Sequence, residues 1–241
     1  IPLERRIYGI PWEWYEEYGI QRLGYHGASH SYVAETLIDM YGSTGKAISC
    51  HLGGSGSLCA IDDGKSVDTS FGISLQVGVI QSNRCGDIDP FIVPFLQKEG
   101  LSLDQVLDGL TKRGGLLGIS GVSNDLRDVQ EAADAGNERA RLAIDVFCNG
   151  IVRHIGAYYA ELGGLDHLVF TGGIGEHGTR IREAVCHQLK HMGILLDDEK
   201  NQSCTGANTV ISRTDSPVTI HVIPANEELG VARKTFAYLR A

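Results

Sequence analysis

Two glycine-rich stretches contain residue types that could hold a phosphate. HLGGSGS occupies residues 51–57, and TGGIGEHG occupies residues 171–178. Backbone N–H groups in a glycine turn, or at the start of a helix, can face an anion because no side chain covers them. The two stretches could therefore hold one nucleotide together, although the first could equally be an ordinary hairpin with a glycine bulge.

Two other interpretations, a Walker A loop and a dinucleotide-binding loop, are less favoured. DDGKS at 62–66 ends like a Walker A loop, but Cys59 stands where that pattern needs a glycine, and a strand is expected where it needs a helix. TGGIGEHG has the glycine spacing of a dinucleotide fingerprint, with Asp197 and Asp198 further along the chain. Too little chain follows Asp198 to complete a dinucleotide domain, so an oxidoreductase fragment is the weakest alternative.

The segments around these stretches alternate between strand and helix patterns, which predicts an α/β fold. Strands are expected at KAISCHL (46–52) and SLCAI (57–61), followed by a tight turn at Asp62-Asp63-Gly64 and a further short strand. LDHLVF (165–170) and VTIHVIP (218–224) have the apolar composition of buried strands. No composition shift or linker marks a domain boundary.

Periodic apolar residues and capping patterns predict the helices. Ser29 is expected to cap a helix that places Val33, Leu37 and Met40 on one face. Ser102 and Gln105 form a capping-box pattern. One long helix is predicted from Asn137 to Leu162, and shorter ones at 179–192 and 226–240.

Composition excludes several classes of protein. The 241 residues carry a formal net charge of −9 and no Lys/Arg cluster, which argues against binding nucleic acid. No apolar run approaches the roughly 20 residues of a membrane helix. Six scattered cysteines fit free thiols in a reducing compartment, so we expect a cytoplasmic protein. His187 and His191 lie four apart on a predicted helix, where a solvated face is a better interpretation than a metal site.

Six stretches together resemble the acetate kinase (acetate/propionate kinase) family over essentially the whole chain. In order, they are YHGASHSYVA, CHLGGSGSLCAIDDGKSVDTSFG, RCGDIDP, GLLGISGVSNDLRD, VFTGGIGE and IPANEELGVAR. The resemblance implies an actin/Hsp70/sugar-kinase-like (ribonuclease H-like) α/β fold. It also implies a homodimer that transfers a phosphoryl group between ATP and a short-chain carboxylate, with ADP and Mg²⁺ also bound.

The family pattern has a first half with a phosphate loop of the form NxGSSSxK, and nothing in this chain corresponds to it. Residues 1–241 are therefore expected to be the C-terminal nucleotide-binding domain, with the N-terminal half absent and the chain a piece of something longer.

The resemblance also assigns roles to individual residues. Arg84 matches the active-site arginine, for which a surface salt bridge to Asp87 or Asp89 is the alternative. His26 matches a histidine that donates to the transferring phosphoryl group, whereas His30 is assigned to structure. Glu227 resembles the carboxylate that holds Mg²⁺ through water, with Glu228 or a purely structural role as alternatives. The expected nucleotide contacts are His51, Gly53, Gly54, Ser55, Gly56, Asp125, Leu126, Arg127, Gly172, Gly173, Ile174 and His177.

The sequence departs from the family pattern at several of these positions. Gly54 and Ser55 replace an asparagine and a glycine, which removes an amide that would reach phosphate and leaves Ser55 as a partial substitute. Tyr25 and Leu75 replace residues of the acyl pocket, and His177 replaces an asparagine. These departures put acetate itself in doubt as the substrate. They also keep open a non-catalytic nucleotide-binding or interaction module.

Overall fold

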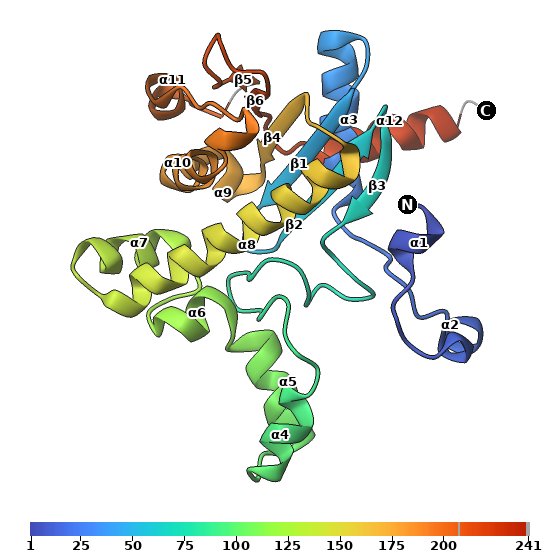
Figure 1. Ribbon diagram of the computed structural model, residues 1–241, viewed down its shortest axis with the longest axis vertical. Coiled ribbons are helices and arrows are strands. Elements are labelled where there is room, and N and C mark those ends of the chain that lie inside the picture. Colours follow the sequence, from blue (N-terminus) through green and yellow to red (C-terminus); the bar gives the residue numbers. More distant parts are fainter. Residues whose placement is uncertain (207, 240–241) are drawn as a thin grey trace.

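A six-stranded mixed sheet forms the centre of the protein in a computed structural model that describes residues 1–206 and 208–239 (Figure 1). The strands are β1 (Lys46–Leu52), β2 (Gly56–Asp62), β3 (Lys65–Thr69), β4 (His167–Thr171), β5 (Thr209–Val210) and β6 (Thr219–Val222). Their order across the sheet is β3-β2-β1-β4-β6-β5. The four strands expected from the sequence and the short strand after the tight turn are all present, which confirms the α/β class.

Strand directions change at β1. Strands β1, β2 and β3 form an antiparallel meander, whereas β4 pairs parallel to β1 and β6 pairs parallel to β4. The turn between β2 and β3 has positive φ at Asp63 and Gly64, as a tight hairpin requires. DDGKS is therefore a hairpin turn followed by a strand, and its exclusion as a Walker loop is confirmed.

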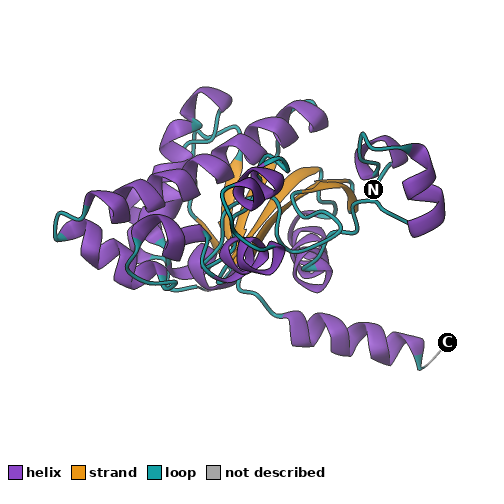
Figure 2. Ribbon diagram, turned by 90° about the horizontal axis from the view of Figure 1, so that it is seen from below, coloured by secondary structure: helices purple, strands orange, loops and turns teal. Residues whose placement is uncertain are grey.

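Helices cover both faces of the sheet. They are α1 (Leu3–Arg6), α2 (Trp12–Tyr18), α3 (Gly27–Tyr41), α4 (Ile92–Lys98), α5 (Leu103–Lys112), α6 (Gly115–Ser120), α7 (Leu126–Asp134), α8 (Glu138–Leu162), α9 (Gly172–His177), α10 (Thr179–Gln188), α11 (Asp198–Ser203) and α12 (Glu227–Tyr238). Figure 2 shows the strands between two helical layers, with α12 on the outside, where it packs against α3. No helix in the described ranges is long and apolar enough to cross a membrane.

Two apolar cores follow from the alternation of side chains along β1. Ile48, Cys50 and Leu52 face the core beneath α8. Ala47 lies on the opposite face, in the smaller core with Val33 and Leu37 of α3. The remaining β1 side chains on that second face are Ser49 and His51, so polar groups lie directly beneath the start of α3.

Most helix predictions hold, and two details are wrong. The capping box at Ser102 and the long helix from Asn137 are confirmed. Ser29 is not a cap, because α3 begins two residues earlier with His26 at its N-cap. The helix predicted over 179–192 ends at Gln188 and continues only as a short 3₁₀ turn, Lys190–Met192.

The loop that carries Arg84 packs tightly against the start of α6. Backbone N–H groups of Gly114, Leu116 and Leu117 donate to carbonyls of Asn83, Gln81 and Ser82, respectively. Gly115 has φ +60°, and a Cβ atom there would lie 2.7 Å from the carbonyl oxygen of Arg84. Only glycine therefore lets α6 approach this loop so closely.

We expect Gly115→Ala to destabilise the protein by more than about 3 kcal/mol, because left-handed strain adds to overpacking against backbone atoms. Gly136→Ala is the matched control. Gly136 also has a positive φ, but a Cβ there would meet nothing within 4 Å, so strain alone should cost about 1–2 kcal/mol. Urea denaturation measures both values, and equal losses in the two variants would contradict the packing argument.

Candidate active site

The parallel pairing of β1 with β4 brings the two glycine-rich stretches together. His51 is in register with Thr171, so both strands end at the same edge of the sheet. Gly172 has φ +76°, and a Cβ there would lie 2.8 Å from the carbonyl oxygen of Leu52. The stretches 51–57 and 171–178 are thus in direct contact although about 120 residues separate them.

A cavity of about 410 Å³ lies between these stretches and the start of α7. Eight of the residues predicted to contact a nucleotide line it: Gly53, Gly54, Asp125, Leu126, Arg127, Gly173, Ile174 and His177. Such a cleft, with glycine backbone on one side and a helix start on the other, suits a phosphorylated ligand. A site shared by both glycine stretches is therefore the arrangement that the structure favours.

The other predicted nucleotide residues lie around this cavity rather than in its wall. His51 and Gly172 line an adjoining hollow of about 340 Å³, together with His26, Glu227 and Glu228. Gly56 is buried at the start of β2.

Asp125 and Arg127 form a local pair at the start of α7. Asp125 caps the helix by accepting from the backbone N–H of Arg127, and its carboxylate also accepts from the Arg127 side chain, 3.0 Å from Nε. The side-chain hydrogen bond from Arg127 lowers the pKa of Asp125 to about 2. Leu126 is largely buried and contributes a small part of the cavity wall. The pair is exposed and charged, which suits contacts to a ribose or base rather than catalysis.

Arg84 is held by neutral groups. Its Nη1 donates to Ser55 Oγ at 3.1 Å and to Gln81 Oε1 at 3.0 Å. Asp87 and Asp89 instead accept from the backbone N–H groups of Gly78 and Phe91. The salt-bridge alternative is therefore wrong in the described chain, and the guanidinium charge is available to an anion.

Gln81 is a site residue that the sequence analysis missed. It is 1% exposed, and its side chain also donates to the carbonyl oxygen of Leu75 at 2.7 Å. Ser55 donates to Gln81 Oε1 at 2.9 Å and accepts from Arg84, so its hydroxyl helps to hold the arginine. No sequence signal distinguishes this glutamine from a surface one, because its bond to Ser55 depends on the turn after β1 folding onto the loop that carries Gln81, Leu75 and Arg84.

A histidine and serine network lies beneath the start of α3. Ser57 Oγ lies 2.9 Å from His26 Nδ1 and 2.9 Å from His30 Nε2, and His30 Nδ1 lies 2.9 Å from Ser49 Oγ. His26 has φ +57°, an unusual backbone conformation for a histidine. The network fixes its ring and confirms the structural role predicted for His30.

Burial keeps these imidazoles neutral. It lowers the pKa of His26 to about 4, with a smaller contribution from His51, and lowers the pKa of His30 to about 3. His51, whose Nδ1 lies 2.8 Å from Ser29 Oγ, also has a lowered pKa because of burial. The ring of His51 stacks on that of His26 at 4.1 Å between centroids. A neutral ring of this kind can donate one N–H without carrying a charge into the site.

Glu227 begins α12 beside the histidines. Its carboxylate lies 3.9 Å from His51 Nδ1, and its side chain is 44% exposed. Asn226 caps the helix by accepting from the backbone N–H of Leu229. Two adjacent carboxylates on an open hollow fit a hydrated Mg²⁺, which keeps much of its water shell.

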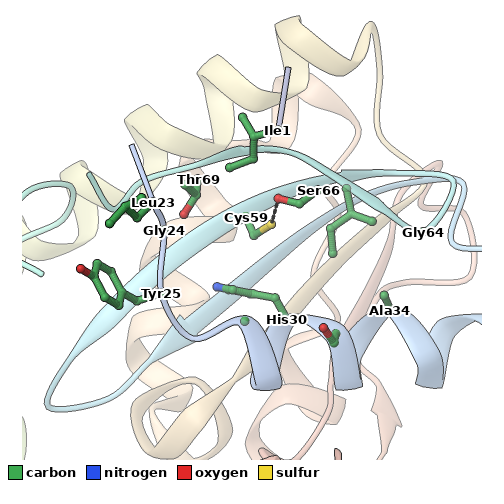
Figure 3. A pocket seen from close by; sticks show the side chains of 13 residues that line it. Ile1, Leu23, Gly24, Tyr25, His30, Ala34, Cys59, Gly64, Ser66 and Thr69 are labelled. Atoms are coloured by element: carbon green, nitrogen blue, oxygen red, sulfur yellow. Dashed lines mark hydrogen bonds between the residues drawn. The ribbon is translucent and has the colours of Figure 1, made fainter. Parts of the chain in front are cut away.

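A second cavity, of about 200 Å³, lies away from the glycine stretches, between α3, β2, β3 and the N-terminal segment. Figure 3 shows Tyr25 at one end of it and Cys59 on the sheet, with Cys59 Sγ 3.1 Å from Ser66 Oγ. Burial raises the pKa of Cys59 to about 11, so it stays a thiol. Tyr25 donates its hydroxyl to the carbonyl oxygen of Ile73 and packs edge-on against Phe71.

Ligand-type side chains also gather between α10 and α11. Glu183, His187 and Asp198 offer atoms within 4.8 Å of one another, and His187 Nε2 lies 3.1 Å from Asp198 Oδ1. His191, paired with His187 in the sequence analysis, is not part of this cluster. All six cysteines are free thiols, as predicted.

Comparisons with known proteins agree with the resemblance. A profile of the acetokinase family matches residues 1–233. The chain is 51% identical over 239 residues to acetate kinase from Dictyoglomus thermophilum, covering 98% of this chain and 60% of that protein. It is 50% identical over 231 residues to propionate kinase from Citrobacter rodentium, covering 94% of this chain and 57% of that protein.

The structural comparison shows the fold directly. The crystal structure of Porphyromonas gingivalis acetate kinase superposes with a TM-score of 0.95 at 38% identity, covering 99% of this chain and 61% of that one. The chain thus spans about 60% of the length of these relatives, and the predicted actin/Hsp70/sugar-kinase-like fold is confirmed. From its sequence and its fold alike, this chain belongs to the acetokinase family.

Proposed function

We propose that this chain is the nucleotide-binding part of a Mg²⁺-dependent carboxylate kinase. The reaction is ATP + short-chain carboxylate ⇌ ADP + acyl phosphate, with acetate or propionate as the acceptor of the phosphoryl group. The observation that carries the proposal is the guanidinium of Arg84, which pairs with no carboxylate among the described residues. Ser55 and Gln81 hold it next to the two glycine-rich stretches, 51–57 and 171–178. The names of the relatives, acetate kinase and propionate kinase, support the same class of substrate.

The proposed mechanism is direct in-line transfer. A carboxylate oxygen of the substrate forms a bond to the γ-phosphorus while the bond from that phosphorus to the β,γ-bridging oxygen breaks, and ADP leaves with that oxygen. The planar fork of Arg84 suits both the carboxylate and the migrating phosphoryl group. His26 donates an N–H to a phosphoryl oxygen, a contact that strengthens as charge spreads over these oxygens.

The remaining site residues bind the nucleotide and the metal ion and orient them. The glycine backbone at 53–54 and 172–173 holds the phosphates, and Asp125, Arg127 and His177 lie where adenosine would extend. Glu227, with Glu228 beside it, would hold Mg²⁺ through water, and the bound ion neutralises phosphate charge. Three further points stay predictions: that another half completes the acyl site, that the protein forms a homodimer, and that it is cytoplasmic.

Arg84→Lys in the full-length protein should lower turnover by at least about a hundredfold, because an ammonium cannot reproduce the planar fork. Nucleotide affinity should change little. Arg213→Lys is the control, since Arg213 pairs with Asp215 on the surface between β5 and β6 and lines neither cavity of the site. ATP-dependent acyl hydroxamate formation measures the reaction. Near-normal turnover in Arg84→Lys would refute the role of Arg84, and no product from the unmodified protein would favour the non-catalytic alternative.

The pH dependence tests whether His26 acts as a neutral donor. Because burial lowers its pKa to about 4, the ring stays neutral above that pH, and kcat/KM should be flat between about pH 6 and 8. A required imidazolium would instead make kcat/KM fall as pH rises. A step in kcat/KM near pH 6.5 that disappears in His26→Asn would show that the ring titrates at its ordinary pKa.

Substrate preference tests the two altered acyl positions. Tyr25 and Leu75 change the polarity and shape of the wall near the acyl chain, and one methylene is worth about 1–3 kcal/mol in such a pocket. We therefore expect propionate, butyrate or a hydroxylated acid to match or exceed acetate in kcat/KM. A wide preference for acetate would mean that both substitutions are neutral.

A further inference from the structure

Glu176 connects the second glycine stretch to the start of α12. Its Oε1 accepts a hydrogen bond from the backbone N–H of Ala225 at 2.9 Å, across 49 residues of sequence. Glu176 lies in α9, the helix that Gly172 and Gly173 begin. Ala225 lies in the short segment between β6 and α12, two residues before Glu227.

A buried arginine fixes the position of Glu176. Arg182 is fully buried, and its Nη1 donates to the carbonyl oxygens of Gly175 at 2.8 Å and Glu176 at 2.7 Å. Its Nε donates to Asn201 Oδ1 at 2.7 Å, and its other terminal nitrogen donates to the Asn201 carbonyl oxygen. The positive charge thus lies at the C-terminal end of α9, where carbonyl groups favour a cation. The backbone of Glu176 is therefore held in place.

The segment on the other side of this hydrogen bond belongs to a different part of the fold. Ala225 is exposed, and the helix that Glu227 begins, α12, packs against α3. Ala225, Glu227, Gly172 and Gly173 nevertheless line the same hollow of about 340 Å³. The Glu176 side chain is thus a direct link between the wall of this hollow that α9 forms and the wall at the start of α12.

From this geometry we infer that Glu176 is a positioning residue that sets where the Glu227 carboxylate stands relative to the phosphates. The inference rests on the proposed function, in which Glu227 holds the metal of the metal–nucleotide complex. Partners that orient a metal-binding side chain typically change metal affinity by 10–100-fold when they are removed. The Ala225 N–H needs only an oxygen acceptor, so the carbonyl oxygen of a glutamine should serve in place of the carboxylate.

The experiment measures metal binding separately from turnover. Mn²⁺ replaces Mg²⁺ as a paramagnetic probe, because it also accepts oxygen ligands, and its binding to the full-length protein with ADP is followed by electron paramagnetic resonance. We expect Glu176→Ala to weaken Mn²⁺ binding by about tenfold and Glu176→Gln to stay close to the unmodified protein. Binding of ADP without metal should not change in either variant.

Two further variants make the outcome decisive. Glu138→Ala removes an exposed carboxylate from the start of α8, which lines neither cavity of the site, and should bind Mn²⁺ normally. Glu227→Gln tests the proposed function itself: unchanged Mn²⁺ binding there would refute the metal role of Glu227. If Glu227→Gln weakens binding but Glu176→Ala does not, Glu176 does not position the carboxylate. Equal losses in Glu176→Ala and Glu176→Gln would also overturn the inference, because the charge and not the acceptor would then matter.

Discussion

The parallel register between β1 and β4 is the constraint on which the rest of the site depends. Two parallel neighbours must end at the same edge of the sheet, so whatever follows each strand is brought together there. Here both strands are followed by glycine, and the close approach of Gly172 to the Leu52 carbonyl leaves no room for a Cβ. Glycine backbone thus forms one wall of the cavity, which Arg127 and His177 also line. This arrangement suits a protein with a net charge of −9 that is proposed to bind a polyanion.

The same sheet also decides which polar groups are buried. Alternation along β1 directs Ser49 and His51 toward α3, while Ile48, Cys50 and Leu52 face α8. Buried imidazoles would be unfavourable if charged, and the lowered pKa of His30 shows that burial keeps the ring neutral. Serine hydroxyls satisfy the ring nitrogens because each can both donate and accept. The network therefore orients His26 without adding positive charge near Arg84.

Two arginines show how environment separates structural from chemical roles. Arg182 is surrounded by carbonyl and amide oxygens that occupy its guanidinium, so it acts as a fixed brace for α9. Arg84 is held only on one side, by Ser55 and Gln81, and keeps further donors for a ligand. Its loop in turn depends on Gly115, which lets α6 donate backbone N–H groups to the carbonyls around it.

The sequence alone determined the features that depend on local pattern. Strand alternation, the capping box at Ser102, the hairpin at Asp63-Gly64 and the long helix 138–162 each follow from a few neighbouring residues. The family motifs predicted roles for Arg84 and His26. Only the tertiary structure decided which distant groups meet. Ser29 resembles a helix cap in sequence, yet its hydroxyl bonds His51 because β1 runs beneath α3. Gln81 and the link from Glu176 to Ala225 have no local signal, since a hydrogen bond between distant loops depends on where the sheet places both partners.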